Sequence, residues 1–220
     1  MKKLGVDVRL GREVTPSTIK EIKPDALVIS AGGTHNIPGI SGINGSNVVS
    51  SKALHGQLKR YLKFIGPKTL YRLSKLWLPL GKNVVVMGGG LQGCQVAAFL
   101  VKRNRKVTIV ETEPLIGDGL LAIMVKPLLL DWLAGKGVTM MTGVKYEEVT
   151  PEGLVITTRD GKKETIKADT VVTALPLLPN ADIIKSLEGM VPEVYAIGDC
   201  KKPQLTVNAI ADGSRIGRTI

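Results

Sequence analysis

The chain has 220 residues, of which 44% are hydrophobic, 22% charged and 4% aromatic, and its formal net charge is +11. This length and composition fit one large or two small globular domains and exclude a disordered chain, and the few aromatic residues leave little to stack on nucleic-acid bases. No apolar run approaches the roughly 18 residues that span a bilayer, and no apolar stretch of a signal peptide follows Lys2 and Lys3, so we expect a soluble, cytoplasmic protein.

Residues 1–33 read as the second half of a nucleotide-binding domain. The segment 5–11 (GVDVRLG) is similar to 137–143 (GVTMMTG), and 23–28 (KPDALV) is similar to 167–172 (KADTVV). An internal repeat of this kind predicts two copies of one fold. The first pair of segments is 132 residues apart in sequence. Because this offset exceeds 88, the counterpart of the glycine turn at Gly88 would lie before Met1. We therefore expect an incomplete second copy with strands near Val6, Val28 and Ala196.

Residues 51–81 form a basic segment. Seven lysines and arginines lie in it and Lys82 follows it, whereas no acidic residue lies between Lys52 and Lys82, so most of the net charge of the chain lies here. Apolar residues at helical spacing, broken at Gly66-Pro67, predict an amphipathic helical excursion; they are Leu54, Leu58, Leu62, Ile65, Leu70, Leu73 and Trp77. We expect it to pack against the rest of a parent enzyme, and its apolar stripe could drive self-association into a homo-oligomer. A membrane-surface role is the alternative.

Residues 83–111 carry the clearest motif. A buried apolar strand, residues 83–87, runs into a glycine turn, a helix and a second strand, residues 106–110, which ends in Glu111. This order is typical of the dinucleotide-binding fingerprint. Gly88 permits the sharp turn, Gly90 lets the backbone approach a pyrophosphate and Gly93 lets the helix pack closely on the sheet. The motif predicts binding of the dinucleotide along the turn, by Gly88, Gly89, Gly90, Leu91, Gln92 and Gly93.

Glu111 predicts a preference for NADH over NADPH. Its carboxylate can accept hydrogen bonds from both ribose hydroxyls of an adenosine and would repel a 2′-phosphate. Thr112 is counted with the binding residues, and neither it nor Glu113 adds positive charge. Only the bases that precede the strand, Arg103, Arg105 and Lys106, could overturn this preference.

The rest of the chain completes the predicted fold. We expect a helix over residues 125–136, a strand over 137–142, a β-meander over 145–167 with a tight turn at Asp160-Gly161, and a buried strand over 169–174. The fold class is therefore α/β: a three-layer Rossmann-like FAD/NAD(P)-binding fold with a β-meander, plus the incomplete copy. Cys94 and Cys200 are too far apart in sequence for a dithiol or zinc motif, and His35 and His55 are interpreted as surface or loop residues.

Three motifs in this order resemble a known family. The segments 25–33 (DALVISAGG), 84–111 and 194–199 (VYAIGD) are similar to the flavoproteins with two dinucleotide-binding domains. More narrowly, they resemble the C-terminal part of the NADH:flavin oxidoreductases related to 2,4-dienoyl-CoA reductase, 2-enoate reductase and trimethylamine dehydrogenase. The resemblance covers nearly the whole chain.

The resemblance implies a domain plan and cofactors. Residues 82–178 would be the NAD(P)H domain, with 1–50 and 179–220 as two pieces of an FAD domain. Ala31, Gly32 and Gly33 match the linker at the FAD site. Gly198 and Asp199 match the second flavin motif, where the aspartate would bind the ribityl chain or the pyrophosphate of FAD. The last helix, over residues 208–220, would point its N-terminus at the flavin. FMN and an iron–sulfur cluster would belong to a barrel that this chain lacks.

One departure bears on catalysis. The family usually has glutamate after Gly-Cys in the NAD helix, whereas Gln95 stands here. We assign no catalytic acid or base, because hydride transfer between stacked rings depends on alignment.

Three functions compete at this stage. The first is the NADH-binding, electron-input portion of a multi-cofactor flavin oxidoreductase, which passes hydride from NADH to FAD. The second is a non-catalytic module that binds an adenine nucleotide as a structural ligand. The third, a nucleic-acid or membrane-surface binder, relies on the basic segment alone. We expect the chain by itself to bind a nicotinamide nucleotide weakly and not to retain FAD.

Overall fold

The computed structural model describes residues 2–76, 78–120 and 125–220. The chain forms two compact units. The larger unit comprises residues 35–176, and the smaller one combines residues 1–34 with residues 177–220. Residues 35–50, grouped above with the flavin domain, thus belong to the larger unit, where β2 (Val48–Ser50) pairs with β9 (Thr170–Thr173).

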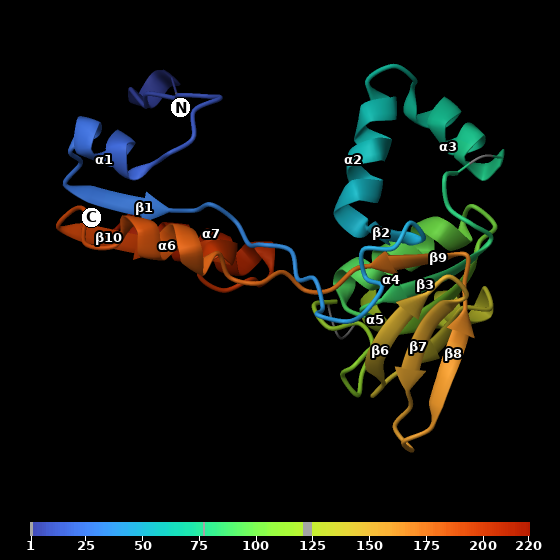
Figure 1. Ribbon diagram of the computed structural model, residues 1–220. Helices are drawn as coiled ribbons and strands as arrows, with labels where there is room; N and C mark the ends of the chain where they lie inside the picture. Colours follow the sequence, from blue (N-terminus) through green and yellow to red (C-terminus); the bar gives the residue numbers. More distant parts are fainter. Residues whose placement is uncertain (1, 77, 121–124) are drawn as a thin grey trace. The chain divides into compact units, whose positions relative to one another are not determined.

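A five-stranded parallel sheet forms the centre of the larger unit, in the order β2-β9-β3-β4-β5 (Figure 1). Its remaining strands are β3 (Asn83–Met87), β4 (Lys106–Val110) and β5 (Thr139–Met141). Two helices join them, α4 (Leu91–Val101) and α5 (Val125–Gly135). The α/β class with a parallel sheet, predicted from sequence, is confirmed.

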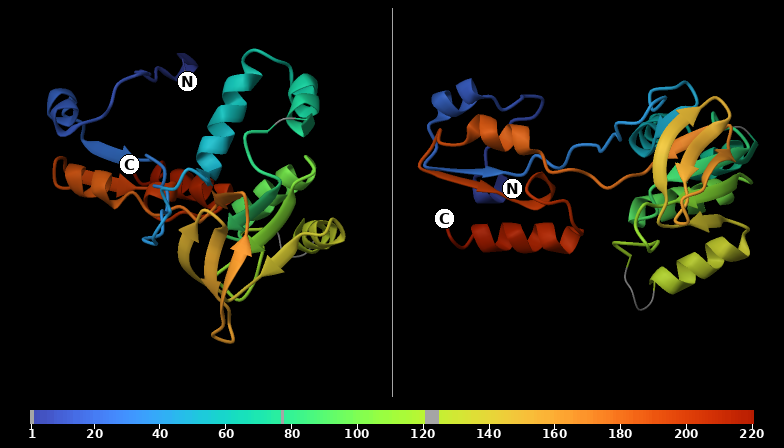
Figure 2. Two further views of the ribbon diagram at one scale, coloured as in Figure 1. Left: turned by 45° about the vertical axis from the view of Figure 1, so that its right-hand side comes forward. Right: turned by 60° about the horizontal axis from the view of Figure 1, so that its bottom comes forward.

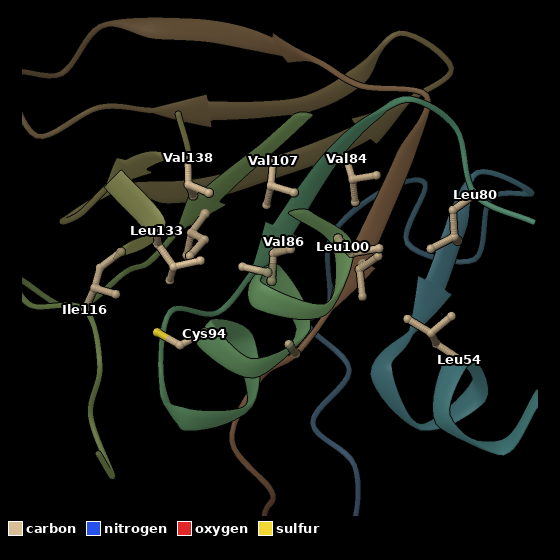
Figure 3. Close-up of a cluster of buried hydrophobic side chains, with 14 of the residues drawn as sticks. Leu54, Leu80, Val84, Val86, Cys94, Leu100, Val107, Ile116, Leu133 and Val138 are labelled. Atoms are coloured by element: carbon tan, nitrogen blue, oxygen red, sulfur yellow. The ribbon is translucent and has the colours of Figure 1, made fainter. Parts of the chain in front are cut away.

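Strand β3 shows how the sequence produces layers. Successive side chains of a strand point to opposite faces, so an unbroken apolar run is buried on both sides. Val84 and Val86 enter a cluster with Cys94 and Leu100 of α4, which Figure 3 shows together with Val107 of β4. The alternate residues of β3 pack on the other face of the sheet.

The β-meander covers that other face. Antiparallel strands β6 (Lys145–Thr150), β7 (Gly153–Thr157) and β8 (Lys163–Lys167) form it, and a tight turn joins β7 to β8. Leu154 and Ile156 of β7 are fully buried against Val85 and Met87 of β3. The unit therefore has three layers, of helices, sheet and meander.

Two amphipathic helices lie between β2 and β3. They are α2 (Ser51–Leu62) and α3 (Pro67–Leu76), and the break falls at Gly66-Pro67, as the sequence predicted. In Figure 1 and the left view of Figure 2, the turn between them lies at the end away from the sheet. Leu54 of α2 is buried in the same cluster as α4. Trp77, counted above in the apolar stripe, lies outside the described residues.

The smaller unit contains a two-stranded parallel sheet of β1 (Ala26–Ile29) and β10 (Glu193–Ala196). Its helical elements are η1 (Lys2–Leu4), α1 (Pro16–Ile22), α6 (Ala181–Leu187), η2 (Gly198–Cys200) and α7 (Thr206–Ile216). Ile19, Ile29, Leu187 and Cys200 form its core.

Two expectations for the smaller unit are wrong. The segment around Val6 forms no strand in the described structure, and Val6, Val8 and Leu10 are exposed. A strand requires a neighbour to accept its hydrogen bonds, and the edge of β1 that is free of β10 pairs with no segment in the described part of the chain. The last helix begins at Thr206 and ends at Ile216, instead of covering residues 208–220.

Among the described residues, no helix is long and apolar enough to cross a membrane.

Candidate functional site

The glycine turn connects β3 to α4, and two of its glycines are required by the protein's own packing. Gly88 has φ of +100°, and a side chain there would lie 2.6 Å from the carbonyl oxygen of Ala174 on the neighbouring segment. A side chain at Gly93 would overlap the carbonyl oxygen of Gly88. The helix therefore packs against the turn at a distance that only glycine allows.

Gly90 differs from both. Its φ of −68° suits any residue, and a Cβ at this position would meet the carbonyl oxygen of Asp118 at an ordinary contact distance of 3.5 Å. Nothing in the described protein therefore demands glycine here. A glycine at the N-terminus of α4 lets a bound phosphate approach the backbone, so the turn fits a dinucleotide.

The backbone donors of the turn are only partly used. The N–H of Leu91 donates to the carbonyl of Asp118 at 2.7 Å, and the N–H of Gly89 donates to Glu111. In the described part of the chain, the N–H groups of Gly90, Gln92 and Gly93 have no hydrogen-bond acceptor. These three donors, together with the helix dipole, are suited to hold an anion.

Glu111 lies at the end of β4 with 8% of its surface exposed. One carboxylate oxygen, Oε2, accepts from the Gly89 N–H at 2.6 Å, and the other, Oε1, accepts from the Thr112 hydroxyl and the Glu113 N–H, both at 3.1 Å. A carboxylate offers about four lone-pair positions, so three are used here. Contact with both ribose hydroxyls would therefore require the Thr112 hydroxyl to turn away, a condition that the sequence did not reveal.

The three bases that could favour NADPH lie at the other end of β4. Arg103 is buried, donating through Nε to the Ser74 hydroxyl at 2.8 Å and through Nη1 to the Phe99 carbonyl at 3.0 Å. Arg105 donates to the carbonyl of Arg103 at 3.0 Å. The five residues of β4 span about 16 Å, which separates these bases from Glu111.

Cys94 lies under the turn and is fully buried, with its thiol donating to the Gly89 carbonyl at 3.3 Å. Burial raises the pKa of this thiol to about 11; nearby Lys126 opposes the shift and Glu111 adds to it. The thiolate is the reactive form of cysteine, so the neutral Cys94 serves packing and not redox chemistry.

Lys126 is a residue that the sequence analysis missed. Its aliphatic carbons pack around Gly117, whose N–H donates to the Gly89 carbonyl at 2.7 Å. This places a cation close to the glycine turn. A lysine in the first turn of a helix has no sequence signature, so only the fold could reveal it.

A cavity of about 610 Å³ adjoins the exposed side of α4, within the larger unit. It brings together both histidines of the chain, two lysines of α2 and two glutamines of α4, above an apolar floor that includes Phe99. Its polar residues are His35, Lys52, His55, Lys59, Gln92 and Gln95. The histidines are exposed, as the sequence indicated, but their proximity to Gln95 was not foreseen.

The expected flavin-site residues meet at one edge of the smaller sheet. Because β1 and β10 are parallel, Ala31–Gly33 after β1 and Gly198–Asp199 after β10 follow the same edge. Gly33 is required there, since a side chain would lie 2.9 Å from the carbonyl oxygen of Leu178. Asp199 accepts from the Gln204 N–H at 3.3 Å, which orients its carboxylate.

Asp212 of α7 supports this edge and was also missed. Its carboxylate accepts from the Gly198 N–H at 3.2 Å and from Arg215 at 3.0 Å. These hydrogen bonds, first that of Gly198, lower the pKa of Asp212. In the described part of the smaller unit, no strand runs into a glycine turn and helix like those after β3.

Comparison with known proteins gives a family match over most of the chain. Residues 1–213 match the family described as pyridine nucleotide-disulphide oxidoreductase. The chain is 27% identical over 221 aligned residues to an NADH oxidase of Thermoanaerobacter brockii, covering 98% of this chain and 31% of that protein. It is 26% identical to a cinnamate reductase of Clostridium sporogenes, covering 100% of this chain and 30% of the relative.

A solved structure is also similar to this chain over its whole length. The complex of 2-naphthoyl-CoA reductase with 2-naphthoyl-CoA superposes with a TM-score of 0.76 at 30% identity, covering the whole of this chain and 30% of that one. The chain thus spans about a third of the length of these relatives.

Proposed function

This chain belongs to the pyridine nucleotide-disulphide oxidoreductase family, and from that premise we propose that it is the NADH-binding, electron-input portion of a flavin oxidoreductase. When bound, NADH supplies the hydride and FAD accepts it. The observation that carries the proposal is the set of free backbone N–H donors of Gly90, Gln92 and Gly93, in a turn that is hydrogen-bonded through Gly89 to the buried carboxylate of Glu111.

Each part of the turn has a proposed role. The free N–H groups of Gly90, Gln92 and Gly93 hold the pyrophosphate, with Gly88, Gly89 and Leu91 shaping the turn. Glu111 accepts from the adenosine ribose, and Thr112 sets how many of its lone pairs are available. Gln92, the second residue of α4, and Gln95 line the cavity described above. We assign the nicotinamide half of the dinucleotide to this cavity.

The smaller unit supplies flavin contacts in this proposal. Asp199 binds the ribityl chain or the pyrophosphate of FAD, and Ala31, Gly32 and Gly33 border the same site. The N-terminus of α7 faces the flavin. We propose the domain plan given above with one change: the first flavin-binding piece ends near residue 34 instead of residue 50, and the NAD(P)H domain still ends near residue 178.

The relatives support a larger assembly. The NADH oxidase and the cinnamate reductase are each more than three times as long as the matched region. We therefore propose that this portion works with a barrel that carries FMN and an iron–sulfur cluster, where a reducible substrate binds.

Anaerobic titration of the flavin-loaded parent protein with NADH tests the proposal. Bleaching of the visible flavin absorbance by NADH supports electron input. Equal binding of ADP and NADH without any bleaching would instead assign the second function, a structural nucleotide site.

A further inference from the structure

The basic hairpin, residues 51–76, is held firmly where it joins the larger unit. Leu54 of α2 is 4% exposed in the main core. Ser74 of α3 receives the hydrogen bond from buried Arg103, whose guanidinium also lies 5.5 Å from the centre of the Tyr71 ring. The hairpin therefore has a defined position on the larger unit.

The far end of the hairpin exposes apolar side chains. Phe64, in the turn between α2 and α3, is 83% exposed. Leu62 and Tyr61 precede it and are exposed by 45% and 43%. Nearer the joined end, Leu73 of α3 is exposed by 48%. Single apolar residues are normal on a surface, but neighbouring exposed apolar residues, such as Tyr61, Leu62 and Phe64, are typical of an interaction site.

An apolar groove continues from this tip between the two helices. It measures about 210 Å³ and is lined almost entirely by carbon. Its lining includes Leu58, Tyr61, Ile65, Leu73, Leu78 and Pro79. The side chains of α2 and α3 thus leave a gap between the two helices.

The charge on the hairpin has one sign. The seven bases of the hairpin, from Lys52 to Lys75, are exposed, as is Lys82 beyond it, and no acidic residue lies between Lys52 and Lys82. None of the ion pairs among the described residues involves these eight side chains. They give the segment that carries the apolar tip and groove a positive charge without neutralising partners, so charge complementarity favours a broad anionic partner.

We infer that the basic hairpin is a docking surface for an anionic phospholipid membrane, with Phe64 and Leu62 entering the headgroup region and the lysines and arginines contacting lipid phosphates. Helices of 12 and 10 residues are too short to span a bilayer but suit its interface. A groove lined almost entirely by carbon exposes very few hydrogen-bonding groups to the edges of bases, which favours lipid over nucleic acid.

Vesicle flotation of the purified protein tests this inference. We expect binding to vesicles of equal parts phosphatidylglycerol and phosphatidylcholine, no binding to phosphatidylcholine alone, and weakening by salt. Reversing two charges beside the tip, Lys63→Glu with Lys68→Glu, should lower partitioning about 25-fold or more, since each base near an anionic surface contributes about fivefold.

A matched control carries the same change of net charge elsewhere. Lys162→Glu with Lys163→Glu alters two exposed lysines, one in the turn before β8 and one at the first position of β8, and should leave partitioning unchanged. Phe64→Ser should lower partitioning at least about tenfold. Phe64→Trp should retain it and give a blue-shifted emission that brominated lipid quenches.

Four results would overturn the inference. They are binding that ignores lipid charge, an equal loss in both double variants, a Phe64→Trp emission unchanged by vesicles, and binding of single-stranded RNA without binding of vesicles. The replaced residues are exposed, so circular dichroism should show wild-type folding. NADH affinity should be the same in all variants, which separates this test from that of the proposed function.

Discussion

At the scale of single residues, Glu111 combines two tasks, because it fixes the glycine turn through the Gly89 N–H and still presents a carboxylate at the strand end. The cations that could reverse its preference are bound elsewhere: Arg103 is engaged by Ser74 and Phe99 at the opposite end of β4. We therefore expect specificity at this position to depend on where each charge is held, and not on the number of charges nearby in sequence.

We predict a preference for NADH over NADPH of at least about tenfold, because a buried carboxylate repels a 2′-phosphate. Glu111→Ala should weaken NADH binding and reduce the preference, as measured by fluorescence titration. Glu113→Ala removes an exposed carboxylate two residues away and serves as the control. Comparable dissociation constants for NADH and NADPH in the unmodified protein would contradict this assignment.

Gly90 separates binding from folding. Gly90→Ala should raise the dissociation constant for NADH about tenfold or more while changing stability by less than about 1 kcal/mol, because the protein leaves room for the methyl group. Gly93→Ala should instead destabilise the larger unit by about 3 kcal/mol or more through overlap with Gly88. Thermal unfolding and titration of both variants check this contrast. Unimpaired binding by Gly90→Ala would remove the pyrophosphate from this position.

Cys94 makes stability depend on alkaline pH. Its pKa is about 11 when folded and near 9 when unfolded, so the unfolded state loses its proton first as pH rises. The contribution is fully present below pH 9 and is lost progressively toward pH 11. Cys94→Ala should therefore lose less stability over this range than the wild type, as followed by denaturant melts. Identical pH profiles would show that the thiol does not titrate on unfolding.

At the scale of elements, β3, the glycine turn and α4 form because each is encoded by adjacent residues. The apolar run of β3 fills both faces of the sheet, and the small residues of α4 let the helix lie close to it. The basic hairpin depends instead on a distant residue, since Arg103 lies after α4 and fixes Ser74 of α3.

Removing the Ser74 hydroxyl should therefore lower the free energy of unfolding, although Ser74 lies outside the central sheet. We expect Ser74→Ala to lower the free energy of unfolding by about 1–3 kcal/mol, because it leaves the buried Nε of Arg103 without an acceptor. Thr69→Ala changes an exposed hydroxyl on the same helix and should have little effect. Chemical denaturation compares the two, and equal effects would show that Arg103 finds another acceptor.

At the scale of the whole molecule, the two units differ in what they offer a dinucleotide. In the larger unit, a strand, a glycine turn, a helix and an acidic residue all lie within residues 83–111. The smaller unit contributes Ala31–Gly33 and Gly198–Asp199 at the edge of a two-stranded sheet, and its described part lacks a second glycine turn before a helix.

We therefore predict that the 220-residue chain binds NADH weakly and does not retain FAD through purification. A phosphate cradle supplies several backbone hydrogen bonds of about 1 kcal/mol each, together with the helix dipole, and the described part of the smaller unit supplies no such cradle for FAD. The visible spectrum of the purified chain measures retention, and calorimetry measures NADH binding. A yellow preparation with stoichiometric FAD would contradict this prediction.

The sequence by itself determined the features that depend on residues adjacent in the chain. The strand, turn and helix around Gly88–Gly93, the meander and the break at Gly66-Pro67 were predicted because local backbone preference and hydrophobic period specify them. Tertiary structure alone decided the rest: that residues 6–10 form no strand, that Glu111 is held by three donors, that Arg103 is tied to α3, and that Lys126 lies beside the turn. These depend on which group lies opposite, since strand pairing, burial and hydrogen bonding join residues that are far apart in the chain.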